Sequence, residues 1–326
     1  MTNSVEIKLK ELIKETYFEI NKKEPSGSMI DMYLKGLKEG KNLDWLRNMI
    51  KNNVISKPVE NKQLKLPKQK SITNVLTYKN VDWETNHKLT NNILNVFLCV
   101  RDNEDDISVT FTKLKKLERK HKELEFYYYV LENDSKDDTP HVVLDFFNYS
   151  KGKFRIEKSE KKKWGAVADN NRVKDMAKYR NMMKDLCNTW ENSEYSIIVD
   201  TEITFDDDIL EKYISIMQNN KTIVMATPYG TVQETNRYYD TFAFHALEKR
   251  PCVYTYDEER DIFPVNSAFA GFGIIRSKFL KDAEWKESDI NVSEHNMLCK
   301  ELRKFGQVVV CKNIVVRWKV GKTSLK

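Results

Sequence analysis

An apolar, β-branched run that ends in two acidic residues constrains the fold of this chain more than any other stretch. Residues 195–199 have the length and composition of a buried strand, and Asp200 and Glu202 follow with one residue between them. The two-residue period of an extended backbone places both carboxylates on the same side. Such a pair at the end of a strand suits Mg²⁺ or Mn²⁺ carrying a diphosphate, and open α/β sheets bind ligands at that edge. An isolated pair of this kind also fits the start of a loop.

The segments around this run alternate between strand and helix patterns. Apolar runs predict strands at 92–100, 126–131 and 222–227, and further short runs lie at 308–310 and 314–316. Apolar residues at helical spacing predict helices at 111–124, 171–187, 209–217 and 293–306. Alternation of this kind is typical of an α/β fold. We therefore predict a doubly wound, mostly parallel sheet with helices on both faces.

The N-terminal region has a different character. Apolar positions at helical spacing predict a small all-helical module over residues 1–53, and packing or oligomerisation is favoured over ligand binding as its role. Residues 54–90 are rich in Lys and Asn, contain two prolines and are interpreted as a linker and lead-in. The linker lysines could touch an anionic membrane surface or an acidic glycan, but a solvated tether is favoured. The large domain would then occupy residues 91–326.

Charge and cysteine usage narrow the function classes. The net charge of +6 resides in residues 1–90, which hold 17 basic and 11 acidic residues, whereas the remainder holds 38 of each. The large domain is therefore not expected to bind nucleic acid. Five cysteines without a Cys-x-x-Cys pair predict reduced thiols and a cytoplasmic protein. Neither a signal peptide nor an apolar stretch long enough to span a bilayer is apparent, and the oligomeric state stays open.

Several polar motifs fall at the ends of the predicted elements. An acidic turn at 132–139 follows the second strand, and the pair Arg180-Asn181 lies on the helix that leads into the acidic strand. Asp240 stands among aromatic residues, and 263–276 concentrates small residues before a strand. Glu294 and His295 begin the helix at 293–306. Arg can pair bidentately with carboxylate or phosphate, so the placement of Arg180 has a chemical reason.

In their order and spacing, these motifs resemble the GT-A nucleotide-sugar glycosyltransferases over residues 92–318, and the nearest match is the fungal capsule-associated mannosyltransferase-like group. The resemblance implies a GT-A-like fold with Asp200-Thr201-Glu202 in place of the family's Asp-x-Asp motif. Glu for the last Asp is a departure that leaves the choice between Mg²⁺ and Mn²⁺ open. Glu294 would be the general base of an inverting enzyme, and the other roles open to it are binding the acceptor and capping the helix. His295, where the family has Asp, puts that role in doubt and could be a metal ligand, an acid/base group or a structural residue.

The resemblance implies a metal-dependent transfer of a sugar from a nucleoside diphosphate sugar to a hydroxyl of a glycan or glycoconjugate acceptor. The predicted metal ligands are Asp200 and Glu202, and the predicted catalytic residues are Glu294, His295 and Asp240. Predicted contacts with the nucleotide sugar are Arg101, Glu132, Asp137, Arg180, Asn181, Asp200, Thr201, Gly271 and Phe272. For Asp137 a structural role in the turn is favoured. The alternatives are a sugar-1-phosphate nucleotidyltransferase and a non-catalytic glycan-binding protein on a transferase scaffold.

Overall fold

The structure is a computed structural model that describes residues 3–21, 91–157, 169–232, 238, 240–247, 260–287 and 292–319, together with residues 30, 33, 34, 37, 46, 47 and 50. The chain divides into two compact units, Met1–Val75 and Leu76–Lys326. In the first unit, helix α1 (Asn3–Asn21) contributes to a small apolar cluster formed by Ile13, Tyr17, Tyr33, Leu34, Leu46 and Ile50. The expected linker at 54–90 lies outside the described residues, so the boundaries at 53 and 90 stay predictions.

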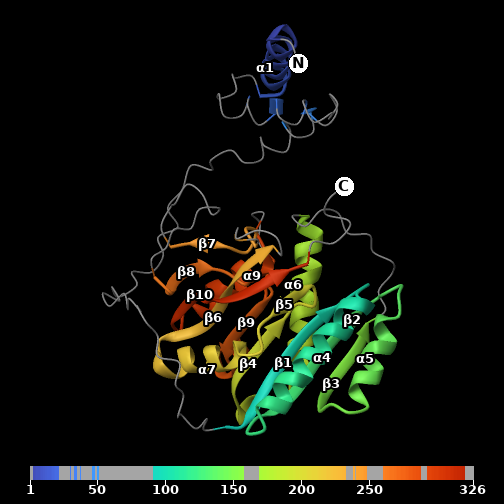
Figure 1. Ribbon diagram of the computed structural model, residues 1–326, viewed down its shortest axis with the longest axis vertical. Coiled ribbons are helices and arrows are strands. Elements are labelled where there is room, and N and C mark those ends of the chain that lie inside the picture. Colours follow the sequence, from blue (N-terminus) through green and yellow to red (C-terminus); the bar gives the residue numbers. More distant parts are fainter. Residues whose placement is uncertain are drawn as a thin grey trace. The chain divides into compact units, whose positions relative to one another are not determined.

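The second unit is built on one large mixed sheet (Figure 1). Its strands lie in the order β3-β2-β1-β4-β9-β6-β10-β8-β7, and β5 pairs with β10. Their bounds are β1 Ile93–Val100, β2 Glu125–Asn133, β3 Gly152–Glu157, β4 Ser193–Val199, β5 Ile203–Phe205, β6 Ile223–Val232, β7 His245–Ala246, β8 Ile262–Ser267, β9 Phe272–Arg276 and β10 Gln307–Trp318.

Most of these strands point the same way. β3, β2, β1 and β4 pair in parallel. β9 runs antiparallel between β4 and β6, so β6 shares the direction of β4, and β10 pairs with β6 in parallel. β8 and β5 run against β10, and β7 runs against β8. The carboxyl ends of β1, β2 and β4 therefore meet at one edge, which confirms the predicted mostly parallel sheet.

Helices cover both faces, as predicted. They are α4 Glu104–Lys120, α5 Thr139–Phe147, α6 Asn170–Asp185, α7 Ile209–Asn219, α8 Ser277–Asp282 and α9 Glu294–Leu302. Adjacent residues of a strand face opposite sides of the sheet. Tyr128 of β2 contacts Phe146 of α5 and donates its hydroxyl to Glu118 of α4. Its neighbour Tyr129 donates to Asn188, just after α6, so α4 and α5 lie opposite α6.

The core explains why the central strands were readable from the sequence. Parallel strands that are covered on both faces are nearly continuous apolar runs, and β4 is buried at six of its seven residues. The edge strand β3 was not predicted, because none of its six residues is buried and it lacks an apolar run. The two runs at 308–310 and 314–316 belong to one strand, β10, whose register shifts between Cys311 and Val315.

Candidate functional site

The acidic pair lies in a bend rather than on the strand. β4 ends at Val199, and Thr201 and Glu202 form a bend directly after it. The alternation of an extended backbone therefore does not bring the two carboxylates together, and this part of the sequence interpretation was wrong. The bend is held by hydrogen bonds from the Asp200 amide to the Gly271 carbonyl (2.8 Å) and from the Thr110 hydroxyl to the Thr201 carbonyl (3.0 Å).

Asp200 and Glu202 nevertheless line the same cavity, which lies beyond the carboxyl ends of β1 and β4. Its volume is about 580 Å³, and its walls come from the ends of β1, β4 and β10, from the turn after β2 and from α6. The lining residues are Cys99, Arg101, Asp102, Asn103, Lys136, Arg172, Met176, Arg180, Asp200, Thr201, Glu202 and Trp318.

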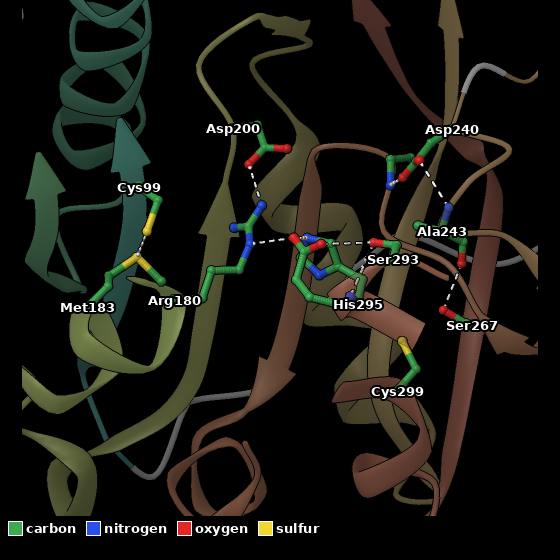
Figure 2. Close-up of polar contacts among 12 residues, drawn as sticks. Cys99, Arg180, Met183, Asp200, Asp240, Ala243, Ser267, Ser293, His295 and Cys299 are labelled. Carbon is green, nitrogen blue, oxygen red and sulfur yellow. Dashed lines mark hydrogen bonds and ion pairs between the residues drawn. The ribbon is translucent and has the colours of Figure 1, made fainter. Parts of the chain in front are cut away.

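Arg180 of α6 joins the acidic bend to helix α9. Its Nε donates to Oε1 of Glu294 at 2.9 Å, and its Nη2 contacts Oδ1 of Asp200 at 3.4 Å. The arginine therefore lies between two carboxylates from separate elements (Figure 2). Its side chain is only 5% exposed, and Nη1 is buried without a hydrogen-bond partner among the described residues. Despite burial, Asp200 and Glu294 raise the pKa of Arg180, so it stays charged.

The two carboxylates of the bend fit a divalent cation. Burial, together with Asp200 and Asp106, raises the pKa of Glu202. Burial also raises the pKa of Asp200, although Arg180 opposes this shift. A cation between them would favour their ionised forms. The described residues contain no cluster of three or more metal-ligating side chains, so a Mg²⁺ or Mn²⁺ ion would need oxygens from a phosphate and water as well, which is usual for Mg²⁺.

Basic side chains also surround the cavity. Arg101, Lys136, Arg172 and Arg180 line it against three acidic residues. A divalent cation held by two of those acids would give the cavity a clear positive excess. The cavity is therefore suited to a small molecule that carries two or more phosphate charges.

None of the predicted catalytic residues lines the cavity, and of the three Glu294 and His295 lie beside Arg180. Glu294 is buried, and the Ser293 hydroxyl donates to its Oε2 at 3.2 Å. Burial opposes ionisation, but His295 and Arg180 outweigh it and lower the pKa of Glu294. His295 stacks on Phe269 with ring centroids 3.8 Å apart. Burial, and then Arg180, lowers the pKa of His295 to about 3, so its ring is neutral near pH 7.

Asp240 is engaged by the backbone. Its Oδ2 accepts from the Ala270 amide at 2.8 Å and its Oδ1 from the Ala243 amide at 3.3 Å. Burial raises the pKa of Asp240 to about 6, and the two amide donors only partly oppose this. Ala270 has φ +56° and Gly271 has φ +82°. A left-handed conformation is disfavoured for Ala by about 1–2 kcal/mol because of its Cβ.

The raised pKa of Asp240 predicts that this residue contributes more to stability at acid pH than at neutral pH. Between about pH 4 and pH 6 the folded protein keeps a proton on Asp240 that the unfolded chain releases. The contribution of Asp240 to the free energy of unfolding should therefore fall as pH rises through this window, by at most about 3 kcal/mol. Urea unfolding of wild type and Asp240→Asn from pH 4 to 7.5 measures this contribution as the difference between the two. A difference that stays constant across the window would contradict the prediction.

Five of the predicted nucleotide-sugar contacts do not line the cavity. Each of the five makes contacts within the fold. Glu132 is 1% exposed and accepts from the Ser135 amide at 2.8 Å. Asp137 accepts from the amides of Glu104 and Thr139. Asn181 exchanges two hydrogen bonds with the backbone of Trp285.

The other two lie in and after the turn that precedes β9. Gly271 has a conformation suited to glycine, and a Cβ there would lie 2.8 Å from a methyl carbon of Ile203. Phe272 is fully buried and stacks on Tyr213. Among the predicted contacts, Arg101, Arg180, Asp200 and Thr201 do line the cavity.

The sequence interpretation missed several lining residues. Asn103 and Lys136 lie in the polar turns after the first two strands, and Arg172 lies on the same helix as Arg180. Their positions at strand ends and on that helix were the available signal. Trp318 had no such signal, since it ends a strand far along the chain. Lys319, which follows Trp318, contacts Asp106 and donates its amide to the Glu202 carbonyl.

Comparison with known proteins finds similarity in shape only. No protein-family model and no curated protein matches the sequence. One similar solved structure is a mannosyltransferase from Pyrobaculum calidifontis in complex with GDP-Man and Mn²⁺, with 11% identity over 71% of this chain and 58% of that chain and a TM-score of 0.48. A second is TarS 1–349 from S. aureus in complex with UDP-GlcNAc, with 15% identity over 70% of this chain and 59% of that chain and a TM-score of 0.46. A third is glucosyl-3-phosphoglycerate synthase from Mycobacterium tuberculosis in complex with Mn²⁺, UDP and phosphoglyceric acid, with 9% identity over 72% of this chain and 73% of that chain and a TM-score of 0.43.

The alignments are partial. They span under two thirds of the first two of these structures, at 58% and 59% of their lengths. At such identities and with TM-scores below 0.5, the overlap is too loose to transfer a function to this chain. Within the described part of the chain, no helix has both the length and the apolar character needed to cross a membrane.

Proposed function

We propose that this chain is a GT-A-like, metal-dependent glycosyltransferase that moves a sugar from a nucleoside diphosphate sugar to a hydroxyl of a glycan or glycoconjugate. The motif order is nearest to that of the fungal capsule-associated mannosyltransferase-like group. One observation carries the proposal: Asp200, Glu202 and Arg180 line one cavity beyond the carboxyl ends of two parallel strands. That is the edge at which α/β sheets bind ligands.

The residues take distinct roles in this proposal. Asp200 and Glu202 would hold Mg²⁺ or Mn²⁺, which when bound supplies positive charge to the departing diphosphate. Arg180 lines the cavity and stays charged, and its guanidinium would stabilise a phosphate of the donor. Glu294 is the candidate base, but Arg180 and Ser293 engage its two oxygens. In the observed conformation Glu294 orients Arg180, and acting as a base requires one of these contacts to open.

The structure of the loops argues against the nucleotidyltransferase alternative. Such an enzyme usually cradles phosphate with free backbone amides in a Gly-rich loop. Here the amides of Asp102, Asn103 and Glu104 donate to side chains of Ser135, Thr139 and Asp137. These three amides are therefore not available to a phosphate.

Nucleotide binding with and without metal tests the proposed function. We expect UDP or GDP to raise the melting temperature in the presence of Mn²⁺ and to do so much less in EDTA. A ligand at about 100 times its Kd stabilises a protein by about 2.7 kcal/mol, which corresponds to several degrees. Hydrolysis of a panel of nucleotide sugars should then identify a donor. Stabilisation by a glycan alone, with no response to either nucleotide, would favour the glycan-binding alternative and contradict the proposal.

A further inference from the structure

A turn with two successive left-handed residues supports the acidic bend. Ala270 and Gly271 both have positive φ, at +56° and +82°, and they lie directly before β9. The Gly271 carbonyl accepts the Asp200 amide at 2.8 Å. The turn therefore holds the backbone of Asp200 through this hydrogen bond, next to the pairing of Val199 with Phe272.

Ala270 needs an external partner to stay in this conformation. Alanine rarely adopts the left-handed region, because its Cβ crowds the backbone there. The partner is Asp240, whose Oδ2 accepts the Ala270 amide at 2.8 Å. Asp240 is separated from Ala270 by thirty residues along the chain, so the contact depends on the tertiary structure.

The segment that carries Asp240 is itself anchored. The Ala243 amide donates to Oδ1 of Asp240, and the Ala243 carbonyl accepts from the Ser267 hydroxyl at 2.7 Å. The same carbonyl accepts from Asn296 of α9 at 3.3 Å. Figure 2 shows this group apart from the Arg180–Asp200 pair. Asp240 thus connects β8 and α9 to the turn before β9.

We propose that Asp240 is a positioning residue: it holds the Ala270–Gly271 turn in the left-handed conformation, and through the Gly271 carbonyl it fixes the backbone of Asp200. In this proposal Asp240 acts through the backbone, since both of its oxygens accept from backbone amides, and its expected part in catalysis stays a separate prediction. The consequence for cation binding rests on the proposed function, since it requires Asp200 to be a metal ligand. The consequence for the backbone does not.

The turn offers a rescue experiment. Asp240→Ala removes the acceptor, while Ala270→Gly removes the side chain that makes the left-handed conformation unfavourable. We expect Asp240→Ala to weaken Mn²⁺ binding about tenfold, equivalent to about 1.4 kcal/mol, in calorimetric titrations with UDP or GDP present. Asp240→Ala combined with Ala270→Gly should recover at least half of that loss on a logarithmic scale. Asp240→Asn keeps an oxygen that can accept the Ala270 amide and should stay close to wild type.

Hydrogen exchange provides a readout that needs no metal. In the peptide that spans residues 198–203, Asp240→Ala should accelerate exchange, and the double variant should slow it again. Tyr128→Phe serves as the matched control, because it loses one hydrogen bond, to Glu118, on the α4 and α5 face. It should lower the melting temperature without changing either Mn²⁺ affinity or exchange at 198–203.

The outcomes separate the two proposals. Unchanged exchange at 198–203 in Asp240→Ala, or equal losses in the single and double variants, would overturn the positioning role. If wild type binds no Mn²⁺ with either nucleotide, the proposed function fails, and exchange alone then decides whether Asp240 fixes the Asp200 backbone. A Mn²⁺ affinity that falls equally in Tyr128→Phe would also overturn the inference, because loss of stability would then explain the effect.

Discussion

Asp200→Asn is expected to lower sugar transfer or donor hydrolysis at least about 1,000-fold, which corresponds to about 4 kcal/mol of transition-state stabilisation. The asparagine keeps the shape of the side chain but loses the anionic oxygen that would bind the cation. It also removes one of the two carboxylates that Arg180 contacts. Initial rates of donor hydrolysis at saturating Mn²⁺ measure the loss.

The same substitution should leave the fold intact. Burial raises the pKa of Asp200, so without a cation its ionised form is disfavoured in the folded state. Removing that charge relieves repulsion, while Arg180 loses part of its pairing. The two effects oppose each other, and the metal-free melting temperature should stay within about 4 °C of wild type. Asp207→Asn, at an exposed acidic position outside the cavity, is the control and should retain activity within a few-fold. A fully active Asp200→Asn would refute the metal role.

Arg180→Met is expected to have the largest effect on stability. It leaves the buried carboxylate of Glu294 without its 2.9 Å partner and removes the charge beside Asp200. Breaking one side of a buried ion pair typically lowers the free energy of unfolding by about 3–5 kcal/mol. Urea unfolding at pH 7 measures this loss. The defect should shrink toward pH 4, because without the arginine the pKa of Glu294 rises and the carboxyl can take up a proton.

A second substitution distinguishes loss of pairing from loss of packing. Arg180→Met combined with Glu294→Gln removes the unpaired charge and should recover most of the stability, but not the activity. Lys174→Met on the same helix is the matched control, because its partner Glu287 is 63% exposed, and it should change stability by less than about 0.5 kcal/mol. If the double variant is as unstable as Arg180→Met, the buried charge is not the cause.

The strands that could be predicted from the sequence are those whose burial produces a continuous apolar run. β1 and β4 are buried on both faces, so their apolar runs marked them. β5 has only three residues and β3 has no buried residue, and neither carries a comparable apolar pattern. These two strands are defined by their pairing with β2 and β10, which the local sequence does not reveal. The order β4-β9-β6 in particular joins segments far apart in the chain.

The site was predictable only in part, because neighbouring residues can face in different directions. Arg180 reaches Asp200, whereas Asn181 on the same helix bonds the backbone of Trp285. The direction of the Glu202 side chain could not be predicted from the two-residue period of a strand, because β4 ends at Val199. The partner of Asp240 lies thirty residues away at Ala270, and no motif in the sequence joins the two. Identifying such contacts required the tertiary structure.

The reversed course of β9 has a geometric consequence for this edge of the sheet. Because β9 runs opposite to β4, its first residue lies where β4 finishes, and Phe272 pairs with Val199. In an all-parallel sheet, only the carboxyl ends of strands would lie at this edge, and each would continue into a separate loop. Inserting one strand backwards brings an arriving peptide alongside the departing one. The bend that carries Asp200 and Glu202 is therefore held by a segment that enters the sheet more than sixty residues later along the chain. Its conformation does not depend on the residues of the bend alone.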